Sequence, residues 1–253
     1  MMISGNTVLI TGGGSGIGLA LAERFLAAKN EVIIVGRNEE KLEHVRSKHP
    51  EIHTRTCDVS KQEDRANLLS WIKAEFPALN ILVNNAGIQE RANLLKEDND
   101  WSRFENELNI NIDGPLHLSM LFTPLLMEKE RSSIINISSG LALTPGAWVP
   151  VYSATKAALH SFTQSLRLQL ADTSVSIVEV FPPAVNTDLG GPGLHTFGAP
   201  LNDFADEIFE GIKGGSLEIG YGDSANRLNS SLEELKKSTE QMWQGFKRNN
   251  PDF

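Results

Sequence analysis

Short apolar runs alternate along the chain with longer segments in which apolar residues recur at helical spacing. Seven runs have the length and β-branched content of buried strands: Thr7–Ile10, Glu31–Val35, His53–Thr56, Ile81–Val83, Ser133–Ile137, Val175–Val180 and Leu217–Ile219. Helices are predicted between them over Ile17–Lys29, Glu39–Lys48, Lys61–Phe76, Trp101–Glu128, Val151–Ala171 and Asp203–Gly214. This alternation predicts a doubly wound α/β fold, a seven-stranded parallel sheet with helices on both faces.

The last part of the chain has an amphipathic pattern of its own. Within residues 222–248, apolar residues recur at helical spacing after the last strand, with charged residues opposite: Leu228, Leu232, Leu235, Met242 and Phe246. We expect a C-terminal helical extension that buries its apolar face either on its own subunit or on a partner subunit. No repeat or linker interrupts the chain, so residues 1–253 are predicted to form one domain.

One local signal concerns the third predicted helix. Ser60-Lys61-Gln62-Glu63 has the residues of a capping box. In that motif the serine and glutamate side chains satisfy free N–H groups of the first helical turn. We therefore expect Ser60 to cap this helix.

Charge and cysteine content narrow the class of protein. The net charge is −9 and the pI is about 5.2, which argues against nucleic acid or an anionic membrane as a partner. The single cysteine, Cys57, excludes an intrachain disulfide and offers no metal cluster, so we expect a reducing compartment and no metal. No run approaches the ~18 apolar residues of a membrane span, and the first strand begins too early for a signal peptide. The expectation is a soluble cytoplasmic protein that acts on a small molecule.

A glycine-rich turn follows the first predicted strand. The segment Thr11-Gly12-Gly13-Gly14-Ser15-Gly16-Ile17-Gly18 leads directly into a predicted helix. Strand, glycine turn and helix together place bare backbone N–H groups against a pyrophosphate at a helix N-terminus. Glycine permits close approach and positive φ. An ordinary turn between strand and helix is the alternative, but this context favours a dinucleotide site of the Rossmann type.

Tyr152 and Lys156 stand four residues apart in a predicted helix. That spacing puts them on one helical face, with Cβ atoms about 5–6 Å apart. A phenol with a pKa near ~10 is a poor acid–base catalyst at neutral pH, and a neighbouring cation is expected to lower that pKa. Alone, the pair could be two surface neighbours. Beside a dinucleotide site, it predicts an acid–base pair.

With Asn84-Asn85-Ala86-Gly87, these motifs resemble the short-chain dehydrogenase/reductase family in its compact form. The resemblance runs from about Thr7 to Thr187. It implies an oxidoreductase that transfers hydride between a nicotinamide cofactor and a carbonyl or secondary alcohol. Ser139, which precedes Tyr152 by thirteen residues, and Asn111, in Asn-Ile-Asp-Gly, match the two other catalytic positions of the family.

The resemblance also implies a role for each catalytic residue. Ser139 would donate a hydrogen bond to the substrate oxygen, and Tyr152 would deliver the proton. Lys156 would lower the pKa of Tyr152 and hold the nicotinamide ribose, while Asn111 would hold a water that links Lys156 to solvent. Ser138 is the alternative to Ser139, and the spacing to Tyr152 favours Ser139.

Cofactor contacts are implied at the carboxyl ends of several predicted strands. By resemblance they are Gly12, Gly14, Ser15, Gly16, Ile17, Gly18, Asp58, Val59, Asn85, Ala86, Gly87, Tyr152, Lys156, Pro182, Val185 and Thr187. Asp58 could equally cap the turn ahead of Ser60. Pro183 departs from the family, which usually has glycine there, and a proline excludes positive φ.

The end of the second predicted strand bears on the choice of cofactor. Val35-Gly36-Arg37-Asn38 has no carboxylate where NAD-type members of the family carry one. A guanidinium binds a 2′-phosphate through paired charge-assisted hydrogen bonds. Arg37 and Asn38 therefore favour NADP(H), with NAD(H) possible if Arg37 instead stacks on the adenine.

The substrate is less defined by the sequence. The Gly- and Pro-rich loop Asp188–Pro200 and Trp148 suggest a partly apolar pocket, while Arg91 could bind a carboxylate. A 3-hydroxy acid dehydrogenase is therefore one alternative. A dinucleotide-binding sensor or scaffold without turnover is another, although it would not need the full catalytic set. By resemblance, Trp101–Glu128 and Val151–Ala171 of two subunits would pack together in a homodimer or homotetramer.

Overall fold

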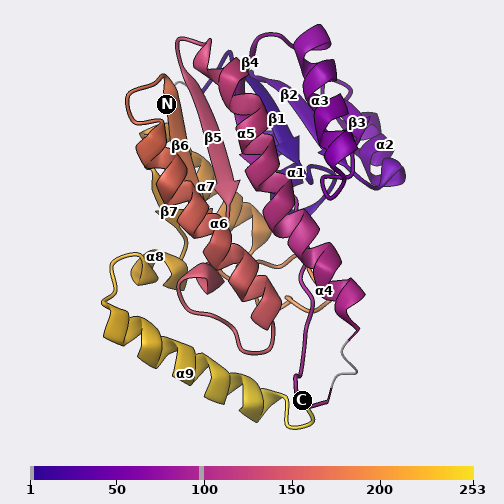
Figure 1. Ribbon diagram of the computed structural model, residues 1–253. Helices are drawn as coiled ribbons and strands as arrows, with labels where there is room; N and C mark the ends of the chain where they lie inside the picture. Colours follow the sequence, from indigo (N-terminus) through magenta and orange to yellow (C-terminus); the bar gives the residue numbers. More distant parts are fainter. Residues whose placement is uncertain (1–2, 97–99) are drawn as a thin grey trace.

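A seven-stranded parallel sheet forms the centre of the computed structural model, which describes residues 3–96 and 100–253 (Figure 1). The strand order is β3-β2-β1-β4-β5-β6-β7. The strands are β1 Thr7–Thr11, β2 Glu31–Gly36, β3 His53–Thr56, β4 Leu79–Asn84, β5 Ser132–Ile137, β6 Val175–Phe181 and β7 Glu218–Gly220. The predicted α/β fold with seven parallel strands is confirmed. Between β1 and β4 the strand order changes direction, and ligands of such sheets bind at the carboxyl ends beside this point.

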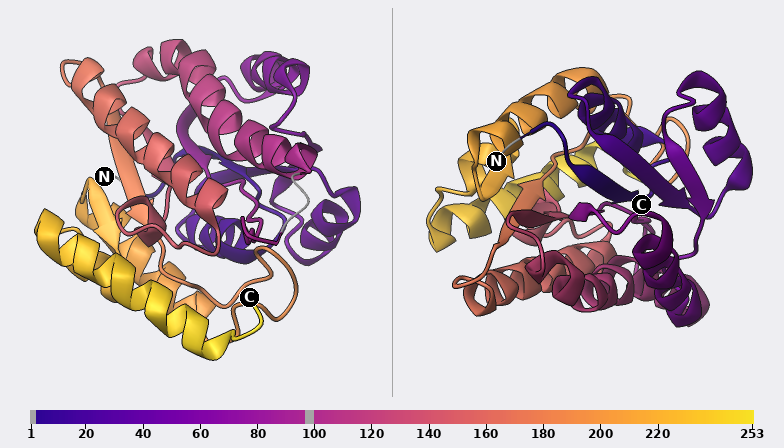
Figure 2. Two further views of the ribbon diagram at one scale, coloured as in Figure 1. Left: turned by 60° about the horizontal axis from the view of Figure 1, so that its bottom comes forward. Right: turned by 90° about the horizontal axis from the view of Figure 1, so that it is seen from above.

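Helices cover both faces of the sheet (Figure 2). They are α1 Gly16–Ala27, α2 Glu39–Lys48, α3 Gln62–Glu75, α4 Trp101–Leu108, α5 Gly114–Met127, α6 Pro150–Gln169, α7 Leu201–Gly214, α8 Asp223–Arg227 and α9 Leu232–Asn249. The core on one face involves α1, α2 and α7, and the core on the other involves α3, α5 and α6. The central strands are therefore covered by apolar side chains on both sides, which explains their continuous apolar runs in the sequence.

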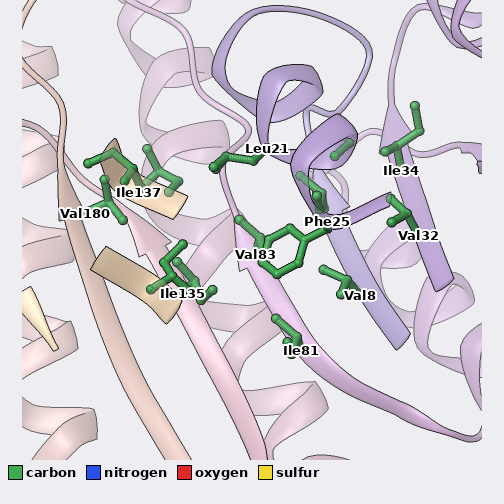
Figure 3. Close-up of a cluster of buried hydrophobic side chains, with 14 of the residues drawn as sticks. Val8, Leu21, Phe25, Val32, Ile34, Ile81, Val83, Ile135, Ile137 and Val180 are labelled. Carbon is green, nitrogen blue, oxygen red and sulfur yellow. The ribbon is translucent and has the colours of Figure 1, made fainter. Parts of the chain in front are cut away.

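Figure 3 shows the core beneath α1. Phe25 and Leu21 of α1 are fully buried against strand residues from neighbouring strands. Among these, Val8 of β1 pairs in register with Val32 of β2 and with Ile81 of β4. This packing fixes the start of α1, and with it the glycine turn, against the carboxyl end of β1.

The predicted helix Trp101–Glu128 is helical from Trp101 to Met127, but it is not one uniform α-helix. A π-helical turn, Asn109–Asp113, separates α4 from α5. The apolar spacing across the segment gave no sign of this break, because one turn of wider helix shifts the periodicity only slightly. Turns of this kind are frequent at functional sites, and this one contains Asn111.

The predicted capping box at Ser60 is wrong. The helix begins one residue later, and its N-cap residue, Lys61, makes no side-chain capping bond. The Ser60 hydroxyl instead donates to the Asp58 carboxylate at 2.7 Å. A complete capping box occurs at Ser231 and Glu234, at the start of α9.

The C-terminal extension forms two helices, α8 and α9, rather than one. α9 runs across the carboxyl-end side of the sheet (Figure 1) and packs on its own subunit through Phe246. The Phe246 ring stacks on Trp148 with centroids 4.7 Å apart and an interplanar angle of 5°. None of the α9 residues is fully buried, so the helix covers the body of the protein from outside. Across residues 3–96 and 100–253, no helix is both long and apolar enough to cross a membrane.

Candidate active site

A cavity of about 1350 Å³ lies at the carboxyl ends of the strands and extends to the inner side of α9. It brings together most of the residues that the sequence singled out: Gly12, Ser15, Gly16, Ile17, Arg37, Val59, Asn85, Ala86, Gly87, Ser139, Tyr152, Lys156, Pro182, Val185 and Thr187. Five others do not line it: Gly14, Gly18, Asn38, Asp58 and Asn111. The cavity is large enough for an extended cofactor and a second small molecule.

The glycine turn leaves the start of α1 open to this cavity. Gly12 and Gly16 have φ values of +66° and +55°, a conformation that favours glycine. A Cβ on Gly12 would lie 2.9 Å from the Ala86 Cα, and one on Gly18 would collide with the Asn85 side chain. Gly18 is thus required by packing inside the protein. The N-cap residue, Ser15, makes no side-chain capping bond, so first-turn N–H groups are free to face an anion.

Thr11 and Asn85 tie the glycine turn to the end of β4. The Thr11 hydroxyl accepts from the Asn85 and Ala86 N–H groups at 3.0 and 3.1 Å. The Asn85 amide donates to the Thr11 carbonyl oxygen at 2.9 Å. Asn84 is buried and donates to Ser119 and Asn136, so it supports the sheet rather than the cavity.

Two basic side chains near the end of β2 line the wall of the cavity. Arg37 is exposed and lines the cavity, as does Lys41 in the first turn of α2. Asn38 does not line it, because its side chain caps α2 by accepting from the Lys41 N–H at 2.8 Å. The sequence reasoning missed Lys41. Its spacing of four residues from Arg37 was the available signal.

Asp58 makes the turn contacts that were expected as the alternative to a cofactor contact. Its carboxylate accepts from the Ser60 N–H at 3.0 Å, and its own N–H donates to the Asp64 carboxylate at 2.8 Å. The neighbouring Val59 faces the cavity instead.

Tyr152 and Lys156 lie side by side on α6, both buried. The Lys156 Nζ is 5.6 Å from the Tyr152 ring centroid and donates to the Ile137 carbonyl oxygen at 2.9 Å. Gly87 lies close to the ammonium of Lys156, since a Cβ on Gly87 would be 3.7 Å from Nζ. The ammonium is therefore held between the ends of β4 and β5.

The expected lowering of the Tyr152 pKa is wrong for this structure. Burial raises the pKa of Tyr152, and the Glu107 charge raises it further, while a hydrogen bond with Ser139 lowers it in part. Burial also lowers the pKa of Lys156 to about 8. Desolvation acts on both groups because it disfavours their charged forms. Tyr152 thus holds its proton at neutral pH, the form in which a phenol donates.

The two adjacent serines differ in what their hydroxyls do. The Ser138 hydroxyl donates to the Val180 carbonyl oxygen at 3.0 Å, so its proton is used within the sheet. The Ser139 oxygen accepts from the Leu141 N–H at 3.0 Å, which leaves its proton for Tyr152 or a ligand. The geometry favours Ser139 as the donor to a reacting oxygen.

Asn111 lies behind the cavity wall. It is fully buried in the π-helical turn, and its amide donates to the Ile88 carbonyl oxygen at 2.9 Å and to the Thr155 hydroxyl at 3.2 Å. Its oxygen accepts from the Ile88 N–H at 3.0 Å. Asn111 therefore holds the segment after β4, including Gly87, against Lys156.

Glu107 is a buried carboxyl group that the sequence reasoning missed. One oxygen accepts from the Glu90 N–H at 3.0 Å, and the other has no partner in the described structure. Burial raises the pKa of Glu107 to about 7. Its place four residues before Asn111 was a usable signal, because both side chains then point from one side of the helix. Its charge reaches Tyr152 and Lys156.

The segment after β6 closes the cavity above the glycine turn. The Pro182 carbonyl oxygen accepts from the Gly140 N–H at 2.9 Å. Thr187 lies opposite the glycine turn, 3.5 Å from where a Cβ on Gly16 would be. No residue from Pro182 to Leu189 has a positive φ, so the backbone of this segment accepts the proline at position 183.

Comparison with known proteins identifies the family. The short chain dehydrogenase family model matches residues 6–194. The chain belongs to the short-chain dehydrogenase/reductase family. The uncharacterized oxidoreductase DltE of Bacillus subtilis (strain 168) is 46% identical over 244 residues, which cover 94% of each protein. The family match extends a few residues beyond Thr187, where the resemblance was expected to fade.

Solved structures of short-chain dehydrogenases share the fold. A short chain dehydrogenase from Burkholderia cenocepacia J2315, in complex with NADP, superposes with a TM-score of 0.82 at 24% identity, covering 94% of this chain and 99% of that one. A 3-ketoacyl-(acyl-carrier-protein) reductase from Brucella melitensis, complexed with NADH, gives a TM-score of 0.78 at 25% identity, covering 86% of this chain and 97% of that one.

Proposed function

We propose that this short-chain dehydrogenase/reductase transfers hydride between NADP(H) and a ketone or aldehyde, or the corresponding alcohol. The observation that carries the proposal is one cavity that joins the open glycine turn to Ser139, Tyr152 and Lys156. The open start of α1 fits a pyrophosphate, and the ammonium of Lys156 fits ribose hydroxyls beside it. The residues that line the cavity are thus suited to bind a nicotinamide dinucleotide and a small carbonyl compound.

In the reduction direction a bound nicotinamide would supply the hydride. Negative charge then grows on the carbonyl oxygen, and the Ser139 hydroxyl donates a hydrogen bond to it. Tyr152 gives that oxygen its phenolic proton. Lys156 stabilises the phenolate that results, because its ammonium lies beside the ring. Asn111 keeps the segment after β4 in place against Lys156.

The direct test is oxidation of NADPH or NADH across a panel of ketones, aldehydes and β-keto acids. We expect at least one carbonyl class to be reduced with saturation kinetics. Tight binding of the cofactor without turnover on any compound would instead favour a sensor or scaffold.

Arg37 and Lys41 support a preference for NADP(H), because they place two cations at the cavity wall beside the end of β2. Arg37→Ala should raise the KM for NADPH by roughly tenfold or more, through loss of charge-assisted hydrogen bonds. The KM for NADH should change little, since NADH lacks the 2′-phosphate. Lys41→Ala should act in the same direction.

Lys48→Ala is the matched control for this pair, because Lys48 is an exposed lysine in the last turn of α2, away from the cavity. An equal rise in KM for both cofactors after Arg37→Ala would indicate stacking on adenine instead. Gly36→Asp should shift preference towards NADH by repelling the phosphate.

We also propose that two subunits pack through α5 and α6. Met120 and Met127 of α5 and Leu168 of α6 are 66%, 49% and 80% exposed, and an interface between subunits would cover them. Leu168→Glu should reduce the mass measured by light scattering to that of a smaller assembly. Leu232→Glu makes the same change at an exposed leucine of α9 and should leave the mass unchanged. A monomeric wild-type protein would refute the proposal.

A further inference from the structure

A guanidinium on the α8 side of the cavity lacks an oxygen partner. Arg227 ends α8, lines the cavity and is half-buried. Its Nη2 donates to the Met242 Sδ at 3.3 Å, and within residues 3–96 and 100–253 it makes no hydrogen bond or ion pair to an oxygen or nitrogen. A thioether is only a weak acceptor. The charge of Arg227 is therefore still free to bind an anion.

Two other half-buried arginines are paired with carboxylates. Arg24 binds the Asp206 carboxylate at 2.9 Å, and Arg167 binds that of Glu218 at 2.9 Å. Burial lowers the pKa of Arg227, while the charge of Asp223 raises it. A desolvated cation without a partner destabilises the fold, so its position in a ligand cavity points to a ligand that pairs with it.

Arg227 lies next to the reacting centre. Its Nη1 is 3.3 Å from where a Cβ on Gly140 would be, and Gly140 directly follows Ser139. A Cβ at position 140 would also collide with the Ser224 hydroxyl. The absence of a side chain at Gly140 thus lets α8 bring the guanidinium close to the serine that faces the reacting oxygen.

From these positions we propose that Arg227 binds a carboxylate of the substrate, so that the preferred substrates are oxo acids, or the hydroxy acids formed from them. This inference rests on the proposed function. A carboxylate is planar and matches the guanidinium in paired hydrogen bonds. A phosphate dianion fits less well, because Asp223 lines the same cavity and would repel it more strongly. Met242 and Phe246 of α9 offer an apolar wall for the rest of the substrate.

Arg91 is another guanidinium that lines this cavity, and it has a different role. It lies over the Phe246 ring, 5.9 Å from the centroid, where a cation–π contact helps to hold α9. Its loss should therefore affect acidic and neutral substrates to a similar degree. Arg91→Met thus separates a general effect on the cavity from recognition of a carboxylate.

The first experiment compares 2-oxohexanoate and 3-oxohexanoate with their methyl esters. Arg227→Met should lower kcat/KM for the acids on the order of 10- to 100-fold, and leave the esters within a few-fold of the wild-type values. Arg227→Lys should restore part of the preference for the acid. Equal losses for acids and esters, or a wild-type preference for the esters, would overturn the proposal. Circular dichroism of each variant shows whether the fold is kept.

A second experiment needs no turnover. Binding of hexanoate and hexanamide to the NADP⁺-saturated protein is followed by tryptophan fluorescence, since Trp148 and Trp243 flank Phe246. Hexanoate should bind Arg227→Met at least tenfold more weakly than wild type, while hexanamide should bind both alike. Unchanged hexanoate binding would overturn the proposal. Binding that depends on Arg227, without reduction of any carbonyl, would refute the proposed function and show only that Arg227 holds a carboxylate.

Discussion

Tyr152→Phe is expected to lower kcat by roughly 10²–10⁴-fold, the usual contribution of a positioned general acid. The phenolic proton is needed only as charge develops on the substrate oxygen, so the loss should fall on kcat rather than on cofactor binding. The fold should be retained, because phenylalanine fills the same buried space on α6. Steady-state kinetics and a fluorescence titration with NADPH measure the two quantities separately.

Tyr221→Phe is the matched control, since it removes the hydroxyl of the other tyrosine in the chain. Tyr221 packs edge-on against Phe204, and its hydroxyl has no hydrogen-bond partner in the described structure, so the change should alter kcat by no more than a few-fold. Activity of Tyr152→Phe within a few-fold of wild type would remove Tyr152 from the mechanism.

Ser139→Ala is expected to raise the reaction barrier by about 2.7–4 kcal/mol, a loss on the order of 10²–10³-fold in kcat. The Ser139 oxygen already accepts from Leu141, so its proton is directed towards Tyr152 and the reacting oxygen. Without that donor, the developing charge loses a preorganised hydrogen bond. The measurement is kcat with the best carbonyl substrate at saturating cofactor.

Ser138→Ala removes the same group one residue earlier. The Val180 carbonyl oxygen would keep its hydrogen bond from the Ser138 N–H at 2.9 Å, so we expect a loss of about 1 kcal/mol in unfolding free energy and little change in kcat. The reverse pattern, with Ser138→Ala the damaging change, would show that the wrong serine has been assigned.

Most of the sheet could be predicted because its central strands are buried on both faces. A run such as Val32–Val35 is then apolar throughout, and the intervening helices show their own period. The π-helical turn at 109–113 could not be predicted in the same way, because it depends on tertiary contacts, such as those of Asn111 with Ile88, that leave no mark on local spacing. The start of α9 has a local signal, the capping box of Ser231 and Glu234.

The residues of the candidate site also divide into those that local motifs predict and those that only the folded structure reveals. Residues carried by local motifs, such as Gly12, Tyr152 and Lys156, could be found from spacing. Arg227 could not, because its importance arises from its burial and from the distant segments that it faces. The Tyr152 pKa was predicted in the wrong direction for the same reason. Spacing reveals the neighbouring cation but not the desolvation, which has the larger effect.

The most direct test of the central claim is the transfer of label from NADPH in which both hydrogens at C4 of the nicotinamide are deuterium. With an accepted ketone, mass spectrometry should find a single deuterium on the new carbinol carbon, in step with the NADPH consumed. Tyr152→Phe should reduce the rate of this transfer without redirecting it. Consumption of NADPH without deuterium in the product, or no reduction of any carbonyl by a protein that binds NADPH, would contradict the account.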